Sequence, residues 1–105
     1  MIAMKIIEQL CDMITEELED AHKYAKCALK RKEEYPHLAD TFSRLSEEEM
    51  RHVSMLHAEV VSLIDSYRKE HGEPPEAMMA VYEYLHERHI DKASEVKAVQ
   101  AMYKQ

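Results

Sequence analysis

LSEEEMRHVSML, residues 45–56, combines the spacing of an amphipathic helix with polar residues in unexpected places. Leu45 and Leu56 belong to an apolar stripe whose members recur every three or four residues, as on one face of a helix. Glu49 and His52 fill the two positions between them, where further apolar residues are expected. A Glu and a His three residues apart lie on the same helical face, so their side chains can converge on one ligand.

Two breaks divide the chain into helices. Pro36 disfavours helix at the residue before it and is well tolerated in a first helical turn. Gly72 and the two prolines that follow it end the second helix and begin the third. Because both connections are short, successive helices are expected to run antiparallel, side by side. The sequence predicts a single all-α domain over residues 1–105, with helices at about residues 2–34, 36–71 and 75–103.

A glutamate interrupts the apolar stripe of the first helix in the same way. Counting outward from the turn before Pro36, Glu17 lies about as far back along the chain as Glu49 and His52 lie forward. At equal rise per residue, these side chains lie at the same height along an antiparallel helix pair. We therefore expect Glu17, Glu49 and His52 to meet within the core seam between the first two helices.

Three ionisable side chains in one seam need a compensating partner. An ionised carboxylate buried alone is costly in free energy. A divalent metal is the strongest compensation, and carboxylate with imidazole suits Fe, Mn or Zn. The alternative is that Glu17 or Glu49 pairs with a Lys or Arg, or lies exposed at the edge of the seam. Spacing by itself leaves both interpretations open.

Two segments resemble the ferritin-like superfamily. TEELEDAHKY, residues 15–24, places Tyr24 seven residues after Glu17, and EEEMRH, residues 47–52, contains Glu-x-x-His. Proteins of that superfamily carry a ligand Glu with a Tyr seven residues later on the first helix, and Glu-x-x-His on the second. The likeness covers roughly residues 6–66. It is closest in kind to short half-site proteins similar to encapsulated ferritins.

The resemblance implies a site shared between two chains. In such proteins, a Glu and a Glu-x-x-His from each chain build one di-iron ferroxidase centre inside a four-helix bundle. Carried over, Glu17, Glu49 and His52 are metal ligands, Glu49 bridges the two metals, and Tyr24 donates a hydrogen bond to a ligand. The expected function is oxidation of Fe(II) by oxygen or peroxide in a homodimer or higher oligomer, with Mn or Zn as other metals.

The resemblance implies a place for the third helix, which we expect to pack alongside the four-helix bundle. It also implies an enclosing shell as a candidate partner for iron handling. The competing interpretation is a helical structural or adaptor module without catalysis, of phage or mobile-element origin.

The third helix lies outside the resemblance, and its role stays open. Glu83 and His86 repeat the Glu-x-x-His spacing, but near the edge of the apolar stripe, so we expect a surface pair. Glu59 and His89 are placed to meet across the second and third helices as a buried hydrogen-bonded or ionic pair. The residues that counting places beside Glu49, as substitutes for a ligand from a second chain, are Glu95 and Gln100.

The net charge and the hydropathy of the chain limit the classes of partner and the compartment that we expect. The formal net charge of −7 argues against nucleic acid or an anionic membrane, since both require a basic face. No apolar run approaches eighteen residues, and the N-terminus lacks a signal-type pattern, so we expect a cytoplasmic protein.

The remaining cysteines and histidines receive no functional role from the sequence. Cys11 and Cys27 lie roughly 24 Å apart by helical rise, too far to bridge within a chain, and are interpreted as small buried apolar residues. The histidines expected on solvent-exposed helix faces are His22, His37, His57 and His71.

Overall fold

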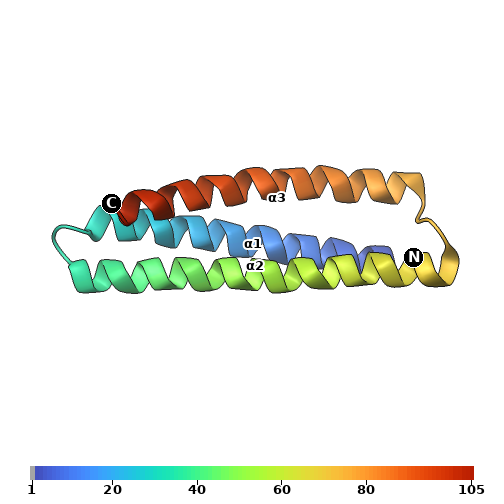
Figure 1. Ribbon diagram of the computed structural model, residues 1–105, viewed down its shortest axis with the longest axis horizontal. Helices are drawn as coiled ribbons and strands as arrows, with labels where there is room; N and C mark the ends of the chain where they lie inside the picture. Colours follow the sequence, from blue (N-terminus) through green and yellow to red (C-terminus); the bar gives the residue numbers. More distant parts are fainter. Residues whose placement is uncertain (1) are drawn as a thin grey trace.

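The computed structural model describes residues 2–105 and contains three long helices joined by short turns. They run antiparallel in chain order and form an elongated bundle of 56 × 18 × 18 Å (Figure 1). The all-α, three-helix prediction is thus confirmed. The helices are α1 (Ile2–Arg31), α2 (Pro36–His71) and α3 (Glu76–Tyr103).

The helix ends follow the breaks that the sequence contains. α1 ends three residues earlier than predicted, where the Tyr35 backbone N–H donates to the carbonyl of Arg31 at 2.9 Å. Pro36 occupies the first turn of α2, where its missing N–H costs no helical hydrogen bond. At the other end, Gly72 adopts φ +82°, a left-handed conformation that glycine reaches without strain, and its N–H donates to Arg68 O at 3.0 Å.

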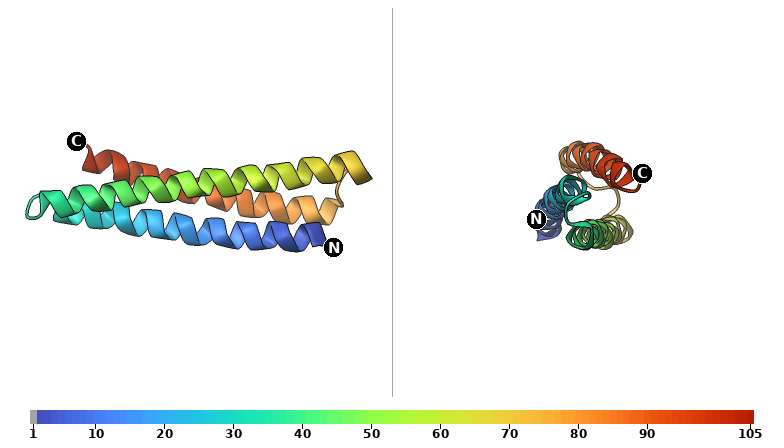
Figure 2. Two further views of the ribbon diagram at one scale, coloured as in Figure 1. Left: turned by 90° about the horizontal axis from the view of Figure 1, so that it is seen from below. Right: turned by 90° about the vertical axis from the view of Figure 1, so that its left-hand side faces the viewer.

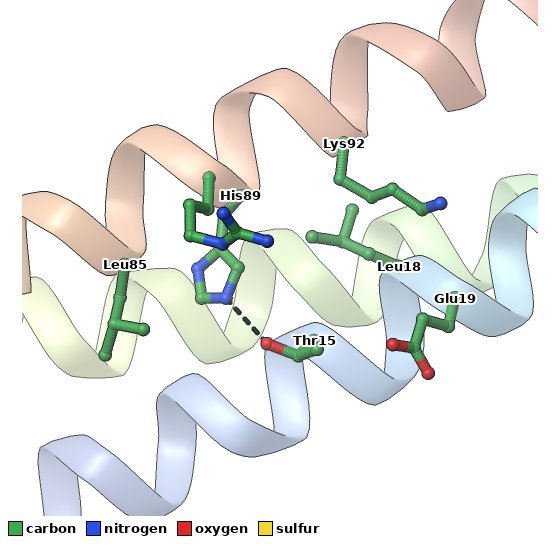
Figure 3. A pocket seen from close by; sticks show the side chains of 7 residues that line it. Thr15, Leu18, Glu19, Leu85, His89 and Lys92 are labelled. Carbon is green, nitrogen blue, oxygen red and sulfur yellow. Dashed lines mark hydrogen bonds between the residues drawn. The ribbon is translucent and has the colours of Figure 1, made fainter.

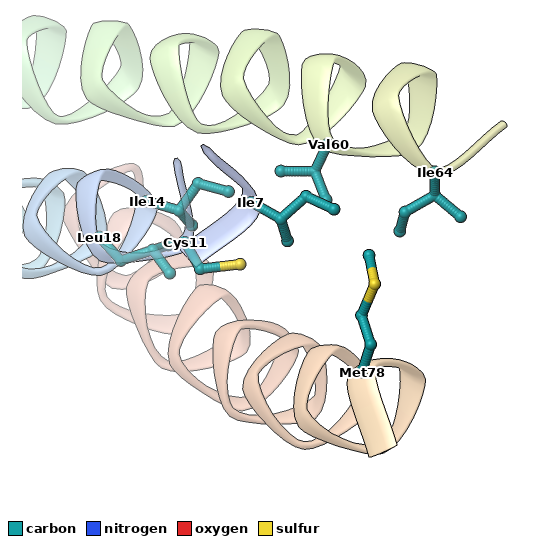
Figure 4. Close-up of a cluster of buried hydrophobic side chains, with 7 residues drawn as sticks. All are labelled: Ile7, Cys11, Ile14, Leu18, Val60, Ile64 and Met78. Carbon is teal, nitrogen blue, oxygen red and sulfur yellow. The ribbon is translucent and has the colours of Figure 1, made fainter. Parts of the chain in front are cut away.

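α1 is the central helix of the bundle. Its buried side chains recur every three or four residues from Ile7 to Ala28, and α3 lies mainly against α1 rather than α2. The end-on view shows the three helices as a triangle (Figure 2). The main apolar cluster gathers near the α2–α3 turn (Figure 4). Its buried members are Ile7, Cys11, Ile14, Leu18, Val60, Ile64 and Met78.

Small residues fill the contact between α1 and α2 at the opposite end of the bundle. Ala21, Ala25 and Ala28 are buried on α1, and they are matched by Ala39, Ser43 and Ser46 on α2. Helices approach more closely where the side chains between them are small. On α2, the larger residues of the predicted stripe, such as Leu38 and Leu45, are therefore exposed or only partly buried.

One face of the α1–α2 pair is consequently lined by partly or largely exposed apolar side chains. The residues of this face share the helical spacing of Glu17 on α1 or of Glu49 and His52 on α2. For the single chain, the prediction that they form the core is wrong for Ile6, Met13 and Leu38, which are exposed, whereas Leu10 and Leu56 are partly buried and pack against the main apolar cluster. We call this surface the outer face; its apolar members are Ile6, Leu10, Met13, Leu38, Phe42, Leu45 and Leu56.

α3 is joined to the other side of the pair by a chain of two hydrogen bonds, one buried and one partly buried. Gln100 Nε2 donates to Ser46 Oγ at 2.9 Å, and Ser46 Oγ donates to the Ala21 carbonyl at 2.7 Å. This chain joins all three helices through one hydroxyl group. Among residues 2–105, no helix is both long enough and apolar enough to cross a membrane.

Candidate metal centre

The helical hairpin brings Glu17, Glu49 and His52 together at mid-length. His52 Nδ1 lies 3.5 Å from Glu17 Oε2 and 3.8 Å from Glu49 Oε1. One donor atom from each residue can be chosen so that all three lie within 4.8 Å of one another. Among residues 2–105, this is the one group of three or more acidic, His or Cys side chains that meets this spacing.

The three side chains lie at the edge of the α1–α2 seam and not within it. Their exposed fractions are 28% for Glu17, 18% for Glu49 and 48% for His52. On α1, Leu18 takes the buried direction, and Glu17 is rotated about 100° from it by the helical repeat. The expectation of a fully enclosed core position was therefore wrong for a single chain.

Neither glutamate is neutralised by a basic side chain. In the described part of the chain, no Lys or Arg nitrogen lies within 4.0 Å of the Glu17 or Glu49 carboxylate, and His52 is the only ion-pair partner of both. The predicted alternative of a Lys or Arg pair is thus not formed. Two carboxylates beside one imidazole leave a local excess of negative charge, which attracts cations.

A shallow hollow opens beside the cluster on the outer face. It is lined by Met13, Glu17, His52, Met55 and Leu56, all from α1 and α2. No α3 residue lines it, so the third helix does not cover the cluster. The carboxylate and imidazole donors are therefore accessible from the side that faces away from α3.

Tyr24 lies on the outer face but is not joined to the cluster. Its ring stacks on Phe42 with 6.3 Å between the ring centres. Among residues 2–105, no hydrogen bond joins the Tyr24 hydroxyl to Glu17, Glu49 or His52. Its role as a hydrogen-bond donor to a ligand stays a prediction.

The α3 residues considered as substitute ligands point elsewhere. Gln100 donates to Ser46, and the Glu95 carboxylate lies 3.4 Å from the Lys92 ammonium group. Neither belongs to the cluster of Glu17, Glu49 and His52. Among residues 2–105, no further His, Cys, Asp or Glu side chain joins this group.

The histidines of α3 have different neighbours from those that the sequence predicts. His89 Nε2 lies 2.9 Å from Thr15 Oγ1, whereas Glu59 is exposed, so the predicted Glu59–His89 pair is absent (Figure 3). His86 is half-buried against His57, with 4.8 Å between the ring centres, and is not part of a surface pair with Glu83.

The prediction for His57 rests on the stripe of Glu49 and His52 alone. A second stripe at three- and four-residue spacing contains Met50, Val53, His57, Val60 and Ile64. Burial lowers the pKa of His57, and the adjacent His86 lowers it further. His57 is half-buried, so the expectation that it faces water was wrong, and this second stripe is the signal that predicts its partial burial. His22 is half-buried as well, and burial lowers its pKa.

Comparisons with models of known protein families, with curated proteins and with solved structures gave no match for this chain. The chemistry of the site must accordingly be argued from its own donors and their geometry. The separations of 3.5 and 3.8 Å lie near the roughly 3 Å between donors bound to one ion. The three donor atoms lie within 4.8 Å of one another, so they are close enough to be candidate ligands of one metal.

Proposed function

We propose that the chain is a ferritin-like di-metal carboxylate protein that oxidises Fe(II) at a site shared between two copies. The observation that carries this proposal is the convergence of Glu17, Glu49 and His52 without a basic partner. Hard carboxylate oxygens with one imidazole form a donor set that suits Fe, Mn or Zn.

One chain supplies half of such a site. Three side chains leave coordination positions open, and no α3 residue fills them. A second copy related by a two-fold axis adds the same three donors, so that four glutamates and two histidines face each other. This is the number of ligands found in carboxylate-bridged di-metal bundles.

The outer face supports pairing with a second copy. Its apolar side chains flank the cluster on both sides along the bundle, from Ile6 and Met13 on α1 to Leu38 on α2. α3 lies on the other side and leaves this face free. Two hairpins that join through it form a four-helix bundle and remove this apolar surface from water.

Each residue has a distinct role in this proposal. Glu17 and Glu49 would hold the iron and supply negative charge, which stabilises Fe(III) relative to the Fe(II) substrate, with Glu49 as the carboxylate shared between the two positions. His52 supplies a neutral nitrogen that keeps the total charge moderate. Bound iron supplies the electrons that oxygen or peroxide takes up. The apolar surroundings of the closed dimer exclude bulk water from the site.

The proposal is tested by adding Fe(II) anaerobically to metal-free protein and then admitting air. Near-ultraviolet absorbance follows oxidation, and light scattering gives the mass. We expect saturation at one iron per chain, oxidation faster than in protein-free buffer, and a dimeric mass. Oxidation at the rate of the buffer control would overturn the catalytic proposal and favour an adaptor module. Binding of Zn without oxygen consumption with iron would indicate a structural metal site.

A further inference from the structure

A hollow of about 190 Å³ opens between α2 and α3. α3 packs mainly against α1, so α2 and α3 leave space between them, and α1 contributes Ile14 to the lining. The other apolar side chains that line it are Met50 and Val53 from α2, and Ile90 and Ala93 from α3. A cavity of about 150 Å³ already holds benzene. The hollow therefore has room for a small organic molecule.

The apolar lining of this hollow stays in contact with water. Ile90 is 53% exposed, and Val53 and Ala93 are only partly buried. Transfer of apolar surface out of water is favourable. A hydrocarbon group placed in the hollow would cover these side chains and gain that free energy.

The ionisable side chains of the hollow all carry nitrogen. They are His57 from α2, and His86, His89 and Lys97 from α3. No Asp or Glu lines the hollow, although the chain contains 21 acidic residues against 14 Lys and Arg. Among residues 2–105, no carboxylate oxygen lies within 4.0 Å of Lys97 Nζ. The Lys97 ammonium group is therefore an unpaired positive charge beside an apolar surface, which favours an anionic ligand.

These groups follow one another along the hollow in a fixed order. On α3, Lys97 comes eleven residues after His86, which corresponds to about 16 Å along the helix axis. Ile90 and Ala93 lie between them. The His86 ring is nearly parallel to that of His57, with 4.8 Å between the ring centres. The hollow thus has a positively charged end, an apolar middle and an end formed by stacked imidazoles.

The imidazole end accepts an uncharged group. Burial lowers the pKa of His57, and the adjacent His86 lowers it further, so the His57 imidazole is neutral near pH 7. His89 is engaged elsewhere, because its Nε2 lies 2.9 Å from Thr15 Oγ1 (Figure 3). The permanent charge of the hollow is therefore that of Lys97 alone.

A cation at one end of an apolar hollow matches one class of ligand. We propose that this hollow binds a small aliphatic carboxylate, with the carboxylate beside Lys97 and the hydrocarbon chain along Val53 and Ile90 towards the imidazoles. A volume of about 190 Å³ is too small for a helix of a partner protein, whose diameter is about 10 Å, so the ligand is a free molecule. The hollow shares no residue with the one beside Glu17 and His52, and no metal takes part.

Titration of the metal-free protein with sodium octanoate, followed by nuclear magnetic resonance, tests this site. We expect saturable shifts of the methyl signals of Val53 and Ile90. Octylammonium has a chain of the same length and the opposite charge, so it should bind this hollow at least about threefold more weakly, even though the protein carries a net charge of −7. Equal or tighter binding of octylammonium at these methyl groups would overturn the proposal. So would octanoate that shifts the Met13 and Met55 methyl signals beside the metal centre equally.

Lys97→Met removes the charge and keeps a side chain of similar length. It should weaken octanoate binding at least about threefold and should not weaken the binding of octylammonium. The matched control, Lys69→Met, replaces an exposed lysine of α2 that does not line the hollow, and should leave the octanoate affinity unchanged. Equal losses of affinity in the two variants would mean that net charge and not Lys97 attracts the ligand, which would overturn the proposal.

Ile90→Glu places a second carboxylate inside the hollow. Because Ile90 is largely exposed, the fold should tolerate this substitution, and the octanoate-induced shift of Val53 should disappear. Val81→Glu, at an exposed position of the same helix outside the hollow, should retain the shift. Octanoate binding that persists in Ile90→Glu, or is lost equally in both variants, would overturn the site. Iron oxidation by the unaltered protein is measured separately, so failure of the proposed function and failure of this site give different results.

Discussion

Glu17 and His52 are 35 positions apart in the sequence, yet Glu17 Oε2 lies 3.5 Å from His52 Nδ1 across the α1–α2 pair. The turn after Arg31 fixes this register, because it sets both residues at equal height on antiparallel helices. His52 also approaches Glu49 at 3.8 Å on its own helix. A single imidazole thus faces two carboxylates, and the group keeps a net negative charge whether His52 is neutral or protonated.

Glu49→Gln should separate metal binding from stability. The substitution keeps the shape of the side chain but removes a charge close to Glu17, so the metal-free protein should melt at an equal or higher temperature. Metal affinity should fall at least about tenfold, because the amide is a poor replacement for a bridging carboxylate. Calorimetry with Fe(II) under anaerobic conditions and thermal unfolding give the two quantities.

The control is Glu48→Gln, which removes the same charge from an exposed neighbouring position. It should alter neither iron affinity nor melting temperature noticeably. If Glu48→Gln and Glu49→Gln reduced iron binding equally, the effect would come from general charge and the cluster would not be the site.

Leu38→Glu should dissociate the proposed dimer. Leu38 lies on the outer face and is 43% exposed in the single chain, so a carboxylate there costs little in the folded monomer but would be buried in the pair. We expect a monomeric mass by light scattering, loss of accelerated iron oxidation and unchanged helix content by circular dichroism. Leu38 is far along α2 from Glu49, so the donors themselves stay intact.

Val81→Glu is the matched control for this experiment. Val81 is 44% exposed on α3, away from the outer face, and the substitution is of the same chemical type. Mass and oxidation rate should be retained. A dimer that survives Leu38→Glu, or is lost equally with Val81→Glu, would show that the outer face is not the dimer interface.

The helices were predictable from the sequence because their boundaries depend on local chemistry. Pro36 and Gly72 restrict the backbone wherever they occur, so α2 was predicted at its observed bounds. The predicted end of α1 was less accurate, because residues 32–34 contain no Pro or Gly and form a turn.

The burial of individual residues was less predictable because it depends on the partner helix. Two apolar stripes adjoin on α1, and the sequence alone does not show that the buried face takes Ile14 from one stripe and Leu18 from the other, while Met13 is left exposed. On α2, the small residues Ala39 and Ser46 are buried in preference to Leu38, because small side chains allow closer helix contact. Glu17 and Glu49 therefore meet as predicted, but at the edge of the seam.

Ser46→Ala should destabilise the bundle by about 1–2 kcal/mol, because it removes a buried hydroxyl that serves as both donor and acceptor. The Gln100 amide loses its acceptor and the Ala21 carbonyl loses its donor. Urea unfolding followed by circular dichroism measures the change. Ser62→Ala, at an exposed position of the same helix, should stay within about 0.5 kcal/mol. Equal losses of stability in Ser46→Ala and Ser62→Ala would mean that the hydrogen-bond chain does not stabilise the packing of α3.

The metal-free protein should lose stability as the pH falls below 6.5. Burial, followed by the proximity of His86, lowers the pKa of His57 and His89 from the ordinary value of 6.5. Between the lowered pKa and 6.5, the unfolded chain binds more protons than the folded one, so unfolding becomes more favourable on acidification. The contribution is complete above pH 6.5 and is lost as the pH falls towards the folded-state pKa.

Melting temperatures at about pH 7.5 and pH 5.5 measure this loss. His57→Gln should reduce it, because it removes one of the three histidines whose pKa is lowered by burial; the others are His22 and His89. His37→Gln replaces an exposed histidine of the same helix and should leave the pH dependence as it is. If His57→Gln changed the melting temperature equally at both pH values, protonation of His57 would not be coupled to unfolding. A reduced difference would instead show that protonation of His57 is coupled to unfolding.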